Sequence, residues 1–189
     1  MFQYTSLSGL KSNTNTAHKM KKKFLLTFIL TYYLGSSQVA IGKTVLESAS
    51  SSIEFGSENR GLVLPWVTNS TNVTGVVNGT MIFDIDDKKI KVYANNAWKD
   101  LTIATNGIAD TTLQDGLTEQ TDAKVSFGTV TSTPGILVLE DTNRAMILPK
   151  VANPYLNIIS PTAGMIVYDT NKKMLAVFNG TVWTFWKAS

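Results

Sequence analysis

Asn59-Arg60-Gly61-Leu62-Val63-Leu64-Pro65 is a short apolar run closed by a proline, and it returns 84 residues later as Asn143-Arg144-Ala145-Met146-Ile147-Leu148-Pro149. Other segments return in the same order at offsets of 85 or 86: residues 39–42 as 125–128, 79–84 as 164–169, 90–93 as 175–178, and Trp98 as Trp183. Ordered self-similarity at one period is the signature of a repeat architecture. The sequence therefore predicts two tandem copies, repeat one at 38–101 and repeat two at 125–189, joined by a connector at 102–124.

Each copy has the pattern of a β-meander and lacks helical periodicity. The apolar runs at 61–64 and 145–148 end at prolines, which cannot donate to a β-ladder. Asn and Asp side chains favour the turns that follow, and Asn-Gly is the strongest short hairpin signal. Further strands are expected at 80–84, 89–93 and 97–101 of repeat one and at 165–169, 174–178 and 181–186 of repeat two, with turns at 86–87, 95–96, 171–172 and 179–180. The predicted fold class is all-β, with two tandem β-meander repeats and a polar connector.

The strands are apolar on both faces, which has a consequence for assembly. In strand 80–84, Met81 and Phe83 point one way and Ile82 the other, so both faces must be covered. A unit of about 60 residues buries only about 60% of the surface of its unfolded chain. The repeats must therefore pack on each other or within an oligomer. The connector is polar and has no sustained period, so it can hold the two copies apart, and we expect a homo-oligomer, specifically a trimer of intertwined chains.

The first 37 residues are expected to be an upstream extension and a signal peptide. Met20 precedes the basic Lys21–Lys23 and the apolar run Phe24–Leu34, a pattern typical of a secretory signal. The run is shorter than the ~20 residues of a spanning helix. We expect translation to start at Met20, cleavage within residues 37–42, and no membrane span in the mature protein. The predicted location is secreted, either extracellular, at the cell surface or in the periplasm.

The composition excludes several kinds of chemistry. The chain has no cysteine and one histidine, His18, which lies in the predicted leader. A Cys nucleophile, disulfides and thiolate metal sites are therefore excluded. The full chain has a net charge of +3, but the leader removes five lysines and leaves 12 basic against 14 acidic residues, a net charge of −2. The mature chain thus lacks the basic surface of a nucleic-acid-binding protein.

Four segments resemble the repeat of secreted and surface proteins of flavobacterial type: Gln38–Gly42, Gly61–Thr68, Gly164–Lys173 and Phe178–Trp183. The first of them is also similar to shaft segments of phage tail fibres and trimeric adhesins. These resemblances imply a β-rich, trimeric, stalk-like protein of the cell exterior. Repeat one departs from the pattern at Trp66, where a basic residue is usual, and at Asn95-Asn96, which replaces Asn-Gly.

Six aromatic residues are candidates for stacking on a sugar face, because their rings combine large apolar area with a polar edge. They are Trp66, Tyr93, Trp98, Phe178, Trp183 and Trp186. The alternative is cross-strand packing around the hairpins, and recurrence at equivalent positions favours it. Trp66 and Trp186 have no Trp partner in the other copy, so we expect these two to be exposed.

A calcium loop is a second candidate, at Asp84, Asp86 and Asp87, because alternating carboxylates supply oxygens to a hard cation. No glycine at the bend and no distal Glu completes an EF-hand loop. A hairpin turn built by acidic side chains is the favoured alternative, and no other cofactor is predicted. Arg60 and Arg144 could hold a ligand carboxylate, but ion pairs with neighbouring acidic residues are preferred.

The predicted function is a non-catalytic structural or adhesive surface protein acting by multivalent contact. Hydrolysis would need two carboxylates at a defined separation, and no Glu recurs between the copies in a shared motif, so we do not expect an enzyme. The expected partners are further copies of the chain and a glycan or another cell-surface component. The alternative function is a tandem carbohydrate-binding module. A phage tail-fibre fragment ranks last, because a signal peptide conflicts with assembly in the cytoplasm.

Overall fold

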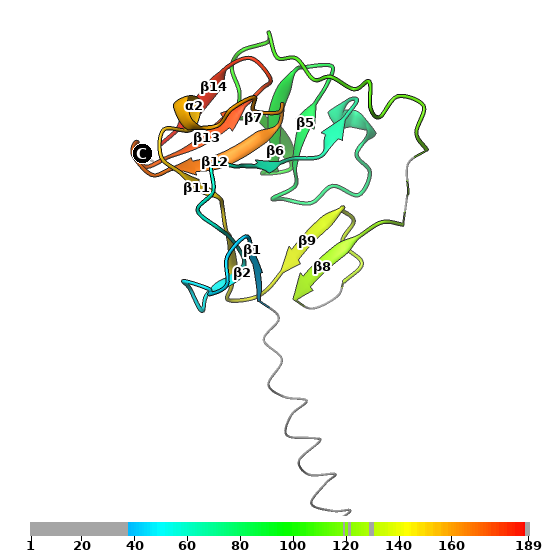
Figure 1. The fold of residues 1–189 in the computed structure, drawn as a ribbon. Helices are drawn as coiled ribbons and strands as arrows, with labels where there is room; N and C mark the ends of the chain where they lie inside the picture. Colours follow the sequence, from blue (N-terminus) through cyan, green and yellow to red (C-terminus); the bar gives the residue numbers. More distant parts are fainter. Residues whose placement is uncertain (1–37, 119, 121, 129–130, 188–189) are drawn as a thin grey trace, which may run out of the picture. The chain divides into compact units, whose positions relative to one another are not determined.

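In this computed structural model, the described part of the chain is residues 38–187, except 119, 121, 129 and 130, and it is almost entirely β (Figure 1). The exceptions are a short 3-10 turn, η1 (Ser70–Asn72), and a single helical turn, α2 (Pro154–Asn157). Among the described residues no helix is long and apolar enough to cross a bilayer. The all-β prediction is confirmed, and the predicted leader at 1–37 lies outside the described residues.

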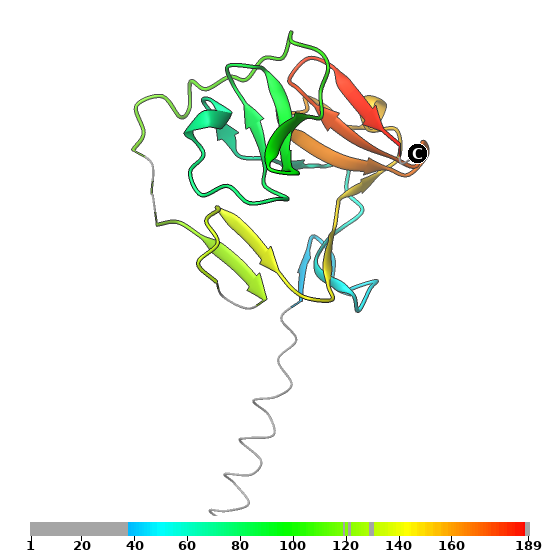
Figure 2. The ribbon, with the colours of Figure 1, turned by 180° about the vertical axis from the view of Figure 1, so that it is seen from behind.

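Each repeat folds its predicted meander into a four-stranded arrangement of the same order (Figure 2). The first strand of each is parallel to the second, and the remaining pairs are antiparallel. Repeat one contributes β4 (Trp66–Val67), β5 (Met81–Asp84), β6 (Lys89–Ala94) and β7 (Ala97–Asp100). Repeat two contributes β11 (Lys150–Val151), β12 (Met165–Asp169), β13 (Met174–Phe178) and β14 (Trp183–Trp186). The short strands after the prolines were not predicted, although they begin each meander.

The turn after the third strand differs between the repeats. Asn95 and Asn96 have φ of 54° and 57°, the left-handed pair that a type I′ hairpin requires. In repeat two the strands end at Phe178 and resume at Trp183. The side-chain oxygen of the buried Asn179 accepts hydrogen bonds there from the backbone N–H of Thr181 at 3.0 Å and Val182 at 2.8 Å. The predicted two-residue turn at 179–180 is therefore a longer loop, because the asparagine side chain closes it.

Each repeat also begins with a pair of parallel strands. In repeat one, β1 (Val39–Ile41) pairs with β2 (Ser51–Phe55), and in repeat two, β8 (Val125–Gly128) pairs with β9 (Leu137–Glu140). The registers correspond, since Val39 lies opposite Ile53 as Val125 lies opposite Leu137. Neither β2 nor β9 was predicted.

Two strands cross from one repeat to the other. β10 (Ala145–Ile147) of repeat two adds to β2 in parallel, and β3 (Leu62–Val63) of repeat one adds to β12 antiparallel. The expectation that the connector keeps the copies apart is wrong. Each repeat offers a strand edge to which a strand of the other repeat adds, so the two repeats pair through their backbones although a polar connector joins them.

A hydrophobic cluster spans the same junction. It joins buried side chains of repeat one with buried side chains of repeat two, namely Leu64, Phe83 and Ile90 with Ala163, Ile166 and Val177. The start of the connector also binds repeat two, through the backbone N–H of Ile108 to the Asn179 carbonyl at 3.2 Å. The Thr181 hydroxyl donates to the Asn106 carbonyl at 2.7 Å. The repeats therefore cover part of each other's apolar surface.

Candidate functional site

The predicted calcium loop is a turn held together by a lysine. Asp84 is fully buried, and its two carboxylate oxygens accept the backbone N–H of Ser70 at 2.9 Å and of Asp87 at 3.0 Å. The ammonium group of Lys91 lies 3.1 Å from Asp84 Oδ2 and also binds Asp87. Two of the three candidate carboxylates thus share a protein cation.

The charges in this turn are mutually stabilised. Burial raises the pKa of Asp84, but the hydrogen bonds from Asp87, Ser70 and Lys91 outweigh it, so the net pKa is lowered. Burial lowers the pKa of Lys91, but Asp87 and Asp84 outweigh it, so the net pKa is raised. The third carboxylate, Asp86, accepts a hydrogen bond from the Asn69 amide at 3.1 Å. Within the described residues no group of three or more His, Asp or Glu could hold a metal ion, and the geometry favours the hairpin interpretation.

Asp169 plays the same structural part in repeat two. Its Oδ1 atom accepts the backbone N–H of Asn171 at 2.9 Å and of Lys172 at 3.1 Å. The residue equivalent to Lys91 is Ala176, and the buried Oδ2 atom of Asp169 has no hydrogen-bond partner among the described residues. The buried aspartate therefore recurs as a turn former, whereas the lysine is specific to repeat one.

Four of the candidate aromatic residues form two cross-strand pairs. Tyr93 and Trp98 are register partners on β6 and β7, with ring centroids 5.3 Å apart in an edge-on arrangement. Phe178 and Trp183 are register partners on β13 and β14, with centroids 5.1 Å apart. Such pairs stabilise antiparallel strands, so this geometry favours packing over ligand stacking.

The remaining two candidates differ from each other. Trp66 was expected to be exposed, but it is half-buried, and its indole N–H donates to the Ala163 carbonyl at 2.8 Å. It fills the junction between the repeats, which explains why no Trp recurs at Lys150. Trp186 is 42% exposed, as expected, and its indole N–H donates to the Leu101 carbonyl at 2.5 Å.

The two arginines form the ion pairs that the sequence favoured. Arg60 lies 3.2 Å from Glu58, and both side chains are exposed. Arg144 lies 3.8 Å from Asp141. Both arginines therefore form ion pairs with acidic residues that lie close to them in the sequence.

A buried carboxylate in β2 was missed by the sequence interpretation. Glu54 accepts the backbone N–H groups of Glu47 and Ser48, both at 2.8 Å, and binds Lys43 at 2.9 Å and Ser51 at 2.7 Å. The Glu47 backbone bond and the bonds from Lys43 and Ser51 lower its pKa to about 2. Its counterpart in repeat two is Val138, so comparison of the repeats gave no signal for it.

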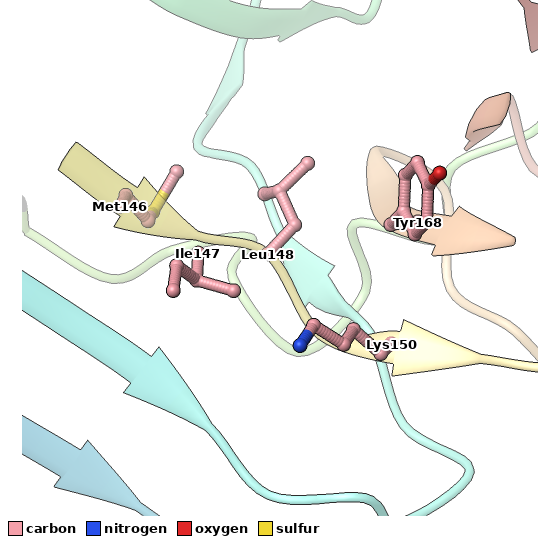
Figure 3. A pocket seen from close by; sticks show the side chains of 5 residues that line it. All are labelled: Met146, Ile147, Leu148, Lys150 and Tyr168. Carbon is pink, nitrogen blue, oxygen red and sulfur yellow. The ribbon is translucent and has the colours of Figure 1, made fainter. Parts of the chain in front are cut away.

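Repeat two leaves apolar surface open where repeat one is covered. On the parallel pairs, Ile53 is 2% exposed but its counterpart Leu137 is 39% exposed. On the meanders, Phe83 is fully buried but its counterpart Tyr168 is 37% exposed. Tyr168 lines a groove of about 300 Å³ together with Met146, Ile147, Leu148 and Lys150 (Figure 3). We refer to Leu137 and these five groove residues as the open face of repeat two.

The open face falls within the region where a comparison with known protein families finds a match. Residues 126–188 match the model of a family described as a phage tail like trimerisation region. No curated protein and no solved structure matches the chain. The matched segment covers nearly all of repeat two, including β9 to β14. The match supports a structural protein that forms a homo-oligomer, and the open face is the best candidate for its functional site.

Proposed function

We propose that this protein is a non-catalytic structural subunit that forms a homotrimeric, fibre-like stalk. The observation that carries the proposal is the match of residues 126–188 to a trimerisation region. The similarity of Gln38–Gly42 to shaft segments of tail fibres and adhesins points to the same architecture.

The open face gives the proposal a physical basis. An exposed leucine, an exposed tyrosine ring and a groove lined mainly by apolar side chains lie in the matched region. The groove residues form one largely apolar patch, and exposed apolar patches mark interaction sites on soluble proteins. Burial of apolar area gives about 25 cal/mol per Å², so covering this face by another copy would stabilise the assembly.

We further propose that the stalk is secreted and acts at the cell exterior by multivalent contact. The support is the basic and apolar pattern of residues 20–34, which is typical of a secretory signal. A trimer presents each surface three times, so that weak contacts to an extracellular glycan or surface component gain effective concentration. The exposed Trp186 keeps a tandem carbohydrate-binding module as the second candidate function.

Mass measurement tests the assembly, and we would use the complete chain expressed in a bacterial host that secretes it. Light scattering after size exclusion is expected to give three times the mass of the processed chain, and N-terminal sequencing is expected to place cleavage within residues 37–42. A monomeric mass at micromolar concentration would rule out the trimeric stalk. Retention of the unprocessed chain inside the cell would rule out secretion.

A further inference from the structure

We propose that copies of this chain bind one another by strand exchange, in which β3 of one copy pairs with β9 of the next and β10 of that next copy pairs with β5 of the first. This inference rests on the proposed function and specifies its interface. Within one chain the two repeats form two strand pairings, β10 with β2 and β3 with β12. The equivalent strands of the opposite repeats could form the same two pairings, β3 with β9 and β10 with β5, but do not pair among the described residues.

The first pairing is that of β10 on β2. Met146 lies opposite Ile53 in this parallel pair. In the opposite repeat of the same chain, Met146 corresponds to Leu62 on β3 and Ile53 corresponds to Leu137 on β9. Among the described residues β9 pairs only with β8, and β3 pairs only with β12. An edge of β9 and an edge of β3 are thus both without a partner strand.

The backbone of β9 is oriented to accept this strand. The N–H of Val125 on β8 donates to the Ile136 carbonyl at 2.8 Å. Successive residues of a strand direct their hydrogen-bonding groups to alternate sides, so Leu137 directs its N–H and C=O away from β8. Unpaired edges of this kind are templates for another chain. Leu137 is 39% exposed, whereas its counterpart Ile53, which has β10 beside it, is 2% exposed. A third strand beside β9 would cover Leu137 in the same way.

The second pairing is that of β3 on β12, where Leu62 lies opposite Ile166. The counterparts of these residues are Met146 on β10 and Met81 on β5. The N–H of Phe83 donates to the Pro65 carbonyl at 2.9 Å, so Met81, two residues earlier, directs its N–H to the same edge. β4 covers that edge only at Phe83 and beyond. No strand of the described residues covers the edge at Met81, so this edge can accept β10 of another copy.

Side-chain volumes fit one side of the second contact. Gly61, which precedes β3, lies so close to β12 that an added Cβ would fall 2.4 Å from Met165 Cγ and 2.8 Å from Val167 Cγ1. In repeat two the counterpart of Gly61 is Ala145, and the counterpart of Met165 is the smaller Thr80. The counterpart of Val167 is the larger Ile82, so the smaller Thr80 makes room for the methyl group of Ala145 on only one of the two sides.

The groove beside β10 has the same explanation. The counterparts of Leu148 and Tyr168 in repeat one are Leu64 and Phe83, and these two pack against repeat two in the cluster at the junction. In repeat two the equivalent surface is left as the groove of Figure 3. Repeat one of a neighbouring copy supplies the matching apolar edge, with Met81 closest to β10.

These contacts are head-to-tail, because each copy uses different surfaces as donor and acceptor. Head-to-tail interfaces close into rings when the rotation allows it. A closed trimer would then alternate repeat one and repeat two around its axis, and every junction between repeats would have the pairing seen within one chain.

Cysteine cross-linking tests the route, since the natural chain contains no cysteine. The test variant is Leu62→Cys with Leu137→Cys in the complete chain. Neighbouring strands lie about 4.8 Å apart, within the Cα separation that a disulfide accepts. Mild oxidation is expected to give covalent dimers and trimers on a non-reducing gel. The matched control is Ile53→Cys with Met146→Cys, which makes the same contact within one chain and is expected to remain at monomer size.

A second variant keeps the test decisive if the cysteines perturb folding. Leu137→Pro removes the N–H at the open edge of β9 without removing a donor to β8, and proline is tolerated on edge strands. We expect it to shift the oligomer to monomer, whereas Leu137→Val, which retains the N–H, leaves the oligomer intact. A trimeric mass with only monomer-sized cross-linked product, or with an unchanged Leu137→Pro variant, overturns strand exchange and leaves the proposed trimer standing. A monomeric wild-type chain overturns the proposed function itself.

Discussion

The indole nitrogen of Trp66 donates a hydrogen bond to the carbonyl oxygen of Ala163 at 2.8 Å, and this bond crosses from repeat one to repeat two. The Trp66 ring also packs near Phe83, with centroids 6.3 Å apart. At the equivalent position repeat two has Lys150, whose ammonium binds Glu47 at 2.9 Å. Both residues therefore contact the other repeat, but Trp66 does so with a half-buried ring and Lys150 with an exposed ion pair.

Trp66→Phe is expected to weaken this junction. The substitution keeps a ring near Phe83 but leaves the Ala163 carbonyl without its donor, which costs about 1 kcal/mol of unfolding free energy. Urea titration followed by circular dichroism measures the change. The control is Trp98→Phe on the β6–β7 hairpin, which retains an aromatic pair with Tyr93 and should cost less. Equal losses in the two variants would contradict a junction role for the indole N–H.

Lys91→Met is expected to destabilise repeat one. It leaves the buried carboxylate of Asp84 without its cation. Breaking a buried pair costs 3–5 kcal/mol, but Asp84 retains two backbone hydrogen bonds, so we expect about 2 kcal/mol. Thermal unfolding at neutral pH measures the loss.

The matched control for this prediction is Lys89→Met. Lys89 pairs at 2.6 Å with Asp100, which is 44% exposed, and exposed pairs contribute 0–1 kcal/mol. The pH dependence of the unfolding free energy gives a second check on the contribution of Asp84. Because the folded pKa of Asp84 is lowered, its stabilising contribution is present above the unfolded value of 3.8 and is lost as the pH falls below it. A Lys91→Met variant as stable as wild type at neutral pH would exclude the ion pair as a stabilising contact.

The lowered pKa of Glu54 makes its contribution to stability depend on pH. Its folded pKa is about 2 against a model-peptide value of 4.5. A lowered folded pKa stabilises the protein above the unfolded pKa, and the contribution disappears as the pH falls through the folded value. We expect the melting temperature of Glu54→Gln to lie below that of wild type at pH 6 and the difference to shrink between pH 4.5 and pH 2. A difference independent of pH would mean that side-chain shape, not charge, matters there.

The sequence predicted those parts of the fold that local signals determine. Asn95 and Asn96 predicted a hairpin because few residues other than asparagine, aspartate and glycine adopt the left-handed backbone of its turn. The constant sequence offset between the two repeats predicted which strands of the two meanders correspond. β2 was not predicted because its buried residues include the polar Ser52 and Glu54, so the segment lacks the apolar pattern expected of a buried strand. The pairing of strands between repeats depends on contacts distant in sequence, which no local pattern encodes.

The candidate site shows the same limit. The acidic turn residues were identified, but the lysine that neutralises them lies on the returning strand, where nothing in the spacing distinguishes Lys91 from a solvated charge. Trp66 was expected to be exposed because it has no counterpart. A residue found in only one copy can instead fill a contact that only that copy makes, and Trp66 does so.

The aromatic residues near the C-terminus separate the two candidate functions. Trp183 packs against Phe178, so Trp183→Ala is expected to cost about 2 kcal/mol of stability. Trp186 is 42% exposed, and its indole N–H donates to the Leu101 carbonyl, so Trp186→Ala is expected to cost less, about 1 kcal/mol. In a screen of soluble glycans followed by Trp fluorescence, the structural role predicts no quenching. Quenching by a glycan that is abolished in a folded Trp186→Ala variant would favour the carbohydrate-binding alternative.

Gly61→Ala distinguishes the contact of β3 with β12 from ordinary strand propensity. An added Cβ would lie 2.4 Å from Met165 Cγ and 2.8 Å from Val167 Cγ1, so the side chains of β12 must shift. Overpacking of this kind costs about 1–3 kcal/mol. Alanine is otherwise the better residue beside a strand, by about 0.5–1 kcal/mol, so propensity alone predicts the opposite sign. The reverse change at the equivalent position, Ala145→Gly, relieves no contact of this kind and is expected to cost only the propensity difference. Chemical denaturation measures the change in unfolding free energy of both variants, and stabilisation by Gly61→Ala would show that β3 does not approach β12 closely in solution.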